Sequence, residues 1–127
     1  MKKLLTSFLY FFSIISVFSL SNCKKESTDT FCLTNRTSIA SLNTRKGIVI
    51  YYQKYNKYAV HIDTSFAGNI DSQVVGLTCN LPHELQAEGI NVSVSGQLKK
   101  FNSDENISPQ MAGDELYYLE IIQIIKK

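Results

Sequence analysis

The chain has 127 residues, a formal net charge of +2, 44% hydrophobic residues and three cysteines. Lys2 and Lys3 account for the positive excess, so the chain after residue 22 carries equal numbers of cations and acids. That length suits one compact domain. The remaining cations are scattered in pairs and not clustered, which argues against nucleic acid as a partner.

The N-terminal segment has the layout of a secretory signal peptide. Two lysines precede an uncharged, mostly apolar run over residues 4–20, and a short polar spacer leads to Cys23. The run is shorter than the roughly 20 residues that span a bilayer, which disfavours an uncleaved membrane anchor. The ending Leu20-Ser21-Asn22-Cys23 resembles a bacterial lipoprotein cleavage box, although Asn22 stands where Gly, Ala or Ser is usual. The resemblance implies a signal peptide over 1–22, lipid (palmitate) on Cys23, and an outer membrane lipoprotein facing the periplasm or the cell surface.

A polar stretch follows the predicted lipidation site. Residues 23–30 are short and rich in Ser, Thr and charge, so we expect a flexible tether before a domain over 31–127. Residues 31–43 contain few sizeable aliphatic side chains. We expect this segment to be extended or irregular, with room for one helical turn.

The rest of the chain favours β-strands. Residues 47–52 are β-branched and aromatic, and residues 57–62 alternate with Val60 and Ile62 on one face, so the two form a hairpin. Residues 73–79 give a third strand, and residues 91–98 alternate with Val92 and Val94 on one side. Gly96 inside that strand indicates a bulge or a tight bend. A polar loop over 102–115 precedes a last strand over 116–125.

A short helix is expected between the third and fourth strands. Pro82 at a first helical position, early acids and a closing Gly89 are helix start and stop signals around two turns. The whole is therefore all-β with one short helix, and its order is that of the five-stranded OB-fold barrel. In such a barrel the helix closes one open end, here with Leu81 and Leu85. A generic antiparallel barrel or sandwich is the alternative.

Two cysteines remain once Cys23 is lipidated. In an oxidising compartment Cys32 and Cys79 are most simply explained as one disulfide. Two buried free thiols, or one catalytic thiol, are the alternatives.

The sequence shows no pattern typical of an enzyme. It has two histidines, His61 and His83, and no spacing that pairs a nucleophile with a base. His83-Glu84 begins like a zinc-protease helix but lacks the second histidine one turn later. We therefore predict no catalytic residues, no metal site and no cofactor.

Two groups of residues could bind a partner. The first is a set of tyrosines that crowd the first hairpin, where OB barrels often stack rings on bases or sugars. This set consists of Tyr51, Tyr52, Tyr55 and Tyr58. Ordinary burial of these rings in the core or at a barrel end is the alternative explanation.

The second group surrounds the expected disulfide. A Cys32–Cys79 bond would hold two segments at one barrel rim: Phe31, Cys32, Leu33 and Thr34 beside Thr78, Cys79, Asn80 and Leu81. Segments fixed in extended form lose less entropy on entering a cleft, which is what inhibiting a peptidase requires. Leu33 or Leu81 would then fill an apolar subsite. The alternative is that the bond only anchors a loose N-terminal segment.

Several runs resemble small OB-fold lipoproteins of Gram-negative envelopes, among them the potempins. The shared pattern is a Cys-Asn-Leu-Pro turn, a short helix, a Val-x-Val-x-Ser-Gly strand and a Tyr-rich last strand. In this chain the pattern occupies residues 76–82, 84–85, 88–98 and 117–121. The resemblance implies a membrane-anchored inhibitor of a secreted peptidase, with metallopeptidases among the candidate targets. A second expectation, of a different class, is an envelope lipoprotein that binds a glycan or a partner protein through the tyrosine-rich OB face.

Overall fold

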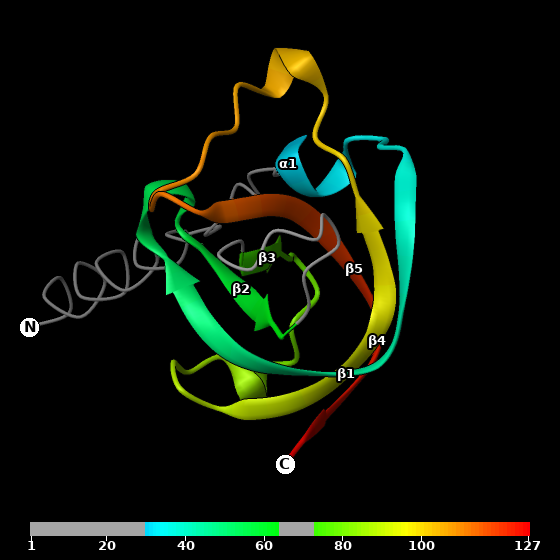
Figure 1. Ribbon diagram of the computed structural model, residues 1–127, viewed down its shortest axis with the longest axis vertical. Helices are drawn as coiled ribbons and strands as arrows, with labels where there is room; N and C mark the ends of the chain where they lie inside the picture. The colour runs from blue at the N-terminus through cyan, green and yellow to red at the C-terminus, as the bar shows by residue number, and fades with distance from the viewer. Residues whose placement is uncertain (1–29, 64–72) are drawn as a thin grey trace, which may run out of the picture.

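The computed structural model describes residues 30–63 and 73–127, and these form a five-stranded closed barrel (Figure 1). The strands are β1 (Ser38–Tyr52), β2 (Lys57–Ile62), β3 (Gln73–Leu77), β4 (Asn91–Lys99) and β5 (Asp114–Lys126). They close in the order β1-β2-β3-β5-β4, with only the β3–β5 pair parallel. The OB-like barrel expected from the sequence is confirmed. The predicted signal peptide, Cys23 and most of the tether lie outside the described residues.

The first strand is much longer than the sequence suggested. The predicted strand began at residue 47, whereas β1 begins at Ser38 and pairs first with β4 and then with β2. The register shifts twice in the added part, between Ser38 and Ala40 and between Leu42 and Arg45. Such bulges break the period-2 alternation by which a strand is recognised in a sequence. The last strand also begins earlier than predicted, at Asp114.

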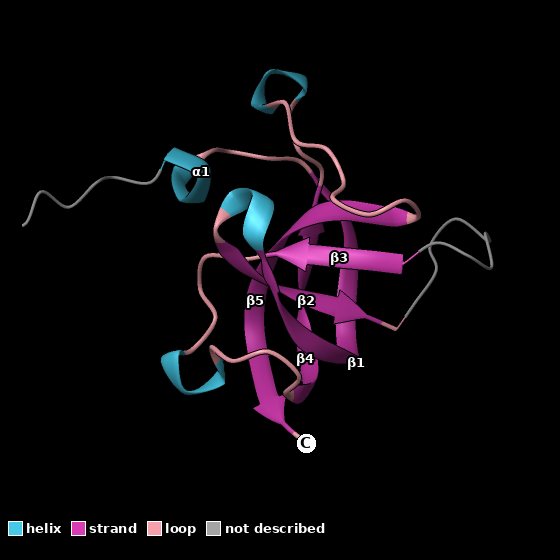
Figure 2. Ribbon diagram, turned by 90° about the vertical axis from the view of Figure 1, so that its left-hand side faces the viewer, coloured by secondary structure: helices cyan, strands magenta, loops and turns pink. Residues whose placement is uncertain are grey.

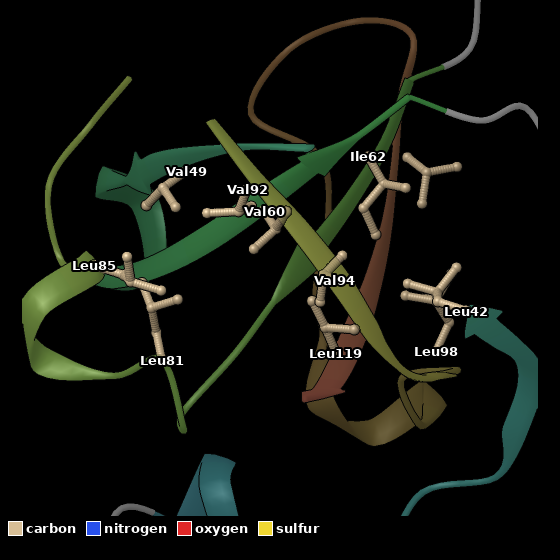
Figure 3. Packing of buried hydrophobic residues seen from close by; sticks show 11 residues of the cluster. Leu42, Val49, Val60, Ile62, Leu81, Leu85, Val92, Val94, Leu98 and Leu119 are labelled. Atoms are coloured by element: carbon tan, nitrogen blue, oxygen red, sulfur yellow. The ribbon is translucent and has the colours of Figure 1, made fainter. Parts of the chain in front are cut away.

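The barrel interior is filled by the alternating apolar residues of the strands. Val60 and Ile62 on β2 point inward with Val92, Val94 and Leu98 on β4, as the alternation predicted (Figure 3). Burial of these aliphatic side chains is the main stabilising contribution to the barrel.

Gly96 produces the expected bulge. The register of β4 on β5 shifts between Ser95 and Gly96, where Ile122 is the extra residue on β5. A Cβ on Gly96 would lie 2.2 Å from the carbonyl oxygen of Glu120. Only glycine lets the two backbones approach this closely.

The element that closes the lower end of the barrel is shorter than predicted. The structure has a single 3-10 turn, η2 (His83–Leu85), instead of two helical turns over 82–89. The chain must return to the sheet at once: the Gly89 N–H donates to the Val49 carbonyl at 2.8 Å, and the Val49 N–H to the Ile90 carbonyl at 2.9 Å. These bonds leave no room for a second turn. Leu81 and Leu85 nevertheless enter the core as expected (Figure 3).

A second apolar cluster lies on the outer face of the barrel. Tyr52, Ala59, Val75 and Leu77 point away from the interior and are buried there. We call these four residues the outer cluster. The covering residues include Phe31 from α1 (Thr30–Leu33) and Phe101 at the start of the loop that follows β4. We call residues 100–113, which join β4 to β5, the upper loop. Figure 2 shows its 3-10 turn η3 (Ser103–Glu105) at the upper end of the molecule.

Candidate functional site

A disulfide joins Cys32 in α1 to Cys79 just after β3. Their Cα atoms are 5.8 Å apart and their sequence separation is 47 residues. The pairing expected from the sequence is confirmed. It fixes the N-terminal turn covalently against the chain that leaves the third strand.

The structure divides the eight residues of the predicted edge into exposed and buried ones. Leu33 is the most prominent, with 71% of its surface exposed, and Cys79 and Asn80 are also exposed. Leu81 is only 5% exposed and belongs to the barrel core, and Thr78 is buried. Phe31, Cys32 and Thr34 are intermediate.

Two details of the predicted edge are therefore wrong. Leu81 cannot be presented to a partner, because it fills the end of the barrel. The N-terminal part is also not extended: Thr30–Leu33 is one helical turn, in which the Thr34 N–H donates to the Thr30 carbonyl at 3.0 Å. The disulfide thus holds a turn whose exposed apolar side chain is Leu33.

A buried arginine fixes the same turn from the other side. The Arg36 side chain is fully buried and forms an ion pair with Glu105 of η3. Its guanidinium carbon lies 4.8 Å from the ring centre of Phe31, 5.1 Å from Phe101 and 4.5 Å from Tyr118. We call these five residues the Arg36 cluster. Cation–π contacts in such a desolvated setting contribute about 1–2 kcal/mol each.

The Arg36 cluster connects three distant parts of the chain. Arg36 donates to the Phe31 carbonyl at 2.8 Å, which ties the segment between α1 and β1 back to α1, while Glu105 comes from the upper loop and Tyr118 from β5. Burial alone raises the pKa of Glu105, but the hydrogen bonds from Arg36 and the Asn102 N–H outweigh it and hold that pKa below its usual value. A charged carboxylate thus compensates the buried guanidinium.

The second segment of the edge is held by Asn80. Its side-chain amide donates to the Ile121 carbonyl at 2.9 Å, and the Thr78 hydroxyl donates to its Oδ1 at 2.8 Å. Asn80 therefore hydrogen-bonds to β5 at a point just beyond the end of β3. Both segments joined by the disulfide are fixed to the sheet independently of it.

The four predicted tyrosines form two pairs on opposite faces of the sheet. Tyr51 and Tyr58 meet edge-on with ring centres 5.1 Å apart, and Tyr58 packs against the inner core. Tyr52 and Tyr55 stack on the outer face with ring centres 5.9 Å apart. Tyr52 belongs to the outer cluster, and Tyr55 packs against it. Because consecutive strand residues point to opposite faces, Tyr51 and Tyr52 cannot share one surface.

The outer pair is covered by the upper loop. The Tyr55 hydroxyl donates to the Ser108 carbonyl and accepts from the Ser108 N–H, both at 2.8 Å. The Tyr52 hydroxyl accepts from the Gln110 N–H. Burial raises the pKa of Tyr52 more than this hydrogen bond lowers it. Tyr52 is thus part of the packing, whereas Tyr51, Tyr55 and Tyr58 stay half-buried.

An open groove of about 440 Å³ with a mixed polar and apolar lining lies beneath the upper loop. Its size is that of small-ligand sites. Charged side chains contribute to it from β5 and the start of the loop. The lining residues are Ile39, Lys100, Phe101, Ile107, Glu115, Leu116 and Tyr117. This groove could not be predicted from the sequence, because its residues come from three separate segments.

Comparison with known proteins supplies no relative. The chain matches no protein-family model, and a search of curated proteins finds no match. Within residues 30–63 and 73–127, no three His, Cys, Asp or Glu side chains gather as metal ligands. In the same part of the chain, no helix has the length and apolar character needed to cross a bilayer.

Proposed function

We propose that this protein is a membrane-anchored peptidase inhibitor that blocks a protease cleft with its disulfide-held edge. It would act by binding alone, without catalysis or a cofactor, on the outer membrane facing the periplasm or the cell surface. The observation that supports this proposal is the fixed turn around Cys32, which presents the largely exposed Leu33. The resemblance to the potempin-like lipoproteins points the same way.

The proposed mechanism is steric occlusion by a rigid surface. Leu33 enters an apolar subsite, and the exposed Cys79 and Asn80 lie along the cleft beside it. The disulfide and the Arg36 cluster both hold the turn before binding, so docking costs little conformational entropy. A turn held at both sides also resists cleavage, since proteolysis occurs mainly in exposed and poorly ordered segments.

The test is inhibition by a soluble form that begins at Lys24, which retains every described element. It is assayed against secreted metallo-, serine and cysteine peptidases. We expect inhibition of at least one class, weakened about tenfold or more by Leu33→Asp, as for a central interface residue. Met111→Asp, at an exposed position in the upper loop, is the matched control and leaves inhibition unchanged. The proposal would be refuted if the protein inhibited none of the three peptidase classes.

The second candidate is an envelope lipoprotein that binds a glycan or a partner protein through tyrosines. The half-buried, edge-on pair Tyr51–Tyr58 favours it, because such rings can stack on a sugar. Under this alternative Tyr58→Ala abolishes capture of the partner, while loss of the disulfide lowers only stability. Tyr52→Ala is not a suitable probe, since Tyr52 is buried and its loss disturbs the packing.

A further inference from the structure

Three exposed isoleucines lie on β1 and β5, in the region where both strands pair with β4 near the C-terminal end of β5. Ile48 is 42% exposed, Ile122 72% and Ile125 53%. Val49 and Ile124 pack with the interior, so the alternation turns Ile48 and Ile125 to the outside. Ile122 is the extra residue of the bulge opposite Gly96. Three isoleucines exposed on neighbouring strands are a starting point for an interaction surface.

The strand register places cations between these isoleucines. Lys46, Ser93 and Ile125 are neighbours across the three strands. Two residues further along β1, on the same face of the sheet, Ile48 lies beside Asn91 of β4. The Asn91 carbonyl accepts a hydrogen bond from the Lys127 N–H at 2.9 Å, which makes Lys127 the third member of this row. Lys46 and Ile48 thus lie on β1, and Ile125 and Lys127 lie at the end of β5. The polar residues between them are Ser93 and Asn91 of β4. We call the outward residues of these two rows, together with Ile122, the basic isoleucine face.

The outward residues of this face carry two positive charges and no negative one. Lys46 and Lys127 of this face are exposed. Their sequence neighbours Arg45 and Lys126 are exposed as well, but they stand in rows with Val94 and Val92, so the alternation turns them to the other side of the sheet. An acidic residue, Asp63, lies next to the face, and its N–H donates to the Lys46 carbonyl at 3.1 Å. A second copy of the chain packed on this face would bring like charges together, which disfavours self-association.

We propose that the basic isoleucine face lies against the anionic headgroups of a phospholipid bilayer. Lysines attract anionic lipids at close range, and isoleucines between them enter the boundary with the acyl chains. The predicted anchor would keep this face near a membrane, since the chain from Cys23 to Thr30 spans about 25 Å when extended. Figures 1 and 2 show α1 in the upper part of the molecule and the C-terminus at its lower end, so the barrel would lie on its side.

The test measures binding of the soluble form beginning at Lys24 to lipid vesicles by co-sedimentation. We expect binding to vesicles of phosphatidylcholine mixed with phosphatidylglycerol, little binding to phosphatidylcholine alone, and release by high salt. The pair Lys46→Gln with Lys127→Gln lowers the partition coefficient about fivefold for each lysine removed. Ile125→Ser lowers it as well. Lys100→Gln and Met111→Ser, at exposed positions outside this face, leave it unchanged.

Two results would overturn the proposal. One is absence of binding to the anionic vesicles, or binding that the face variants and the control variants reduce equally. The other is a concentration-dependent dimer in solution that Ile125→Ser abolishes, because this would make a second copy the occupant. Peptidase inhibition is measured without lipid, so the two proposals succeed or fail separately.

Discussion

At the scale of single residues, the buried Arg36 has the greatest energetic consequence. It is surrounded by three rings and compensated by one carboxylate, so each member depends on the others. Removing the partner of a buried charge is far more destabilising than removing an exposed ion pair.

We predict that Glu105→Gln lowers the free energy of unfolding by about 3 kcal/mol at neutral pH, because it leaves Arg36 buried without a counter-charge. The pKa of Glu105 is lowered in the folded protein. Its contribution is therefore complete above the unfolded-state pKa of about 4.3 and disappears as the pH falls through the folded-state pKa. Urea unfolding of both proteins at neutral and acidic pH measures this difference. Asp104→Asn, at the exposed neighbouring position, is the control, and a difference independent of pH would contradict the prediction.

At the scale of elements, the β4–β5 crossing depends on Gly96. We predict that Gly96→Ala destabilises the protein by about 3 kcal/mol, because a methyl group there collides with the Glu120 carbonyl and the backbone must shift. Gly89→Ala is the comparison: its φ of +85° strains an alanine, but nothing lies within 4 Å. It should cost about 1 kcal/mol. Thermal unfolding compares the two, and equal losses would show that close approach is not what requires Gly96.

The closing turn η2 makes a second prediction at this scale. Leu85→Ala leaves a cavity at the end of the barrel core and should cost about 3 kcal/mol. Leu33→Ala removes the same atoms from an exposed position and should change stability by less than about 0.5 kcal/mol. Urea unfolding of the two variants tests this. Similar values for both would mean that Leu85 does not fill the barrel end.

The sequence predicted the elements best where alternation is regular. β2 and β4 follow the period of two with core residues on one side, and their bounds were predicted to within one residue. The first half of β1 was missed because two bulges interrupt its pattern. The length of η2 was overestimated because the hydrogen bonds between residues 49 and 89–90 are not visible in the local sequence.

At the scale of the whole molecule, the disulfide attaches the N-terminal turn to a barrel whose inner core contains no cysteine. We predict that the double variant Cys32→Ala with Cys79→Ala keeps its β-sheet circular dichroism but loses about 4 kcal/mol of stability, the chain-entropy value for a loop of this length. Urea unfolding of the oxidised protein and the variant measures the loss. A variant without sheet structure would instead make the disulfide essential for the barrel itself.

The sequence alone predicted the barrel class, the two leucines that close its end and the pairing of Cys32 with Cys79. The strand pattern follows because inward and outward positions alternate along single strands, and the cysteine pairing followed from the predicted oxidising compartment, in which two remaining thiols have one simple pairing. Three features became visible in the folded structure alone: which edge residues are exposed, how the tyrosines pair, and that Arg36 contacts Phe31, Phe101, Glu105 and Tyr118. These contacts join segments far apart in the chain, and no local period records which distant side chains the closure of a barrel brings together.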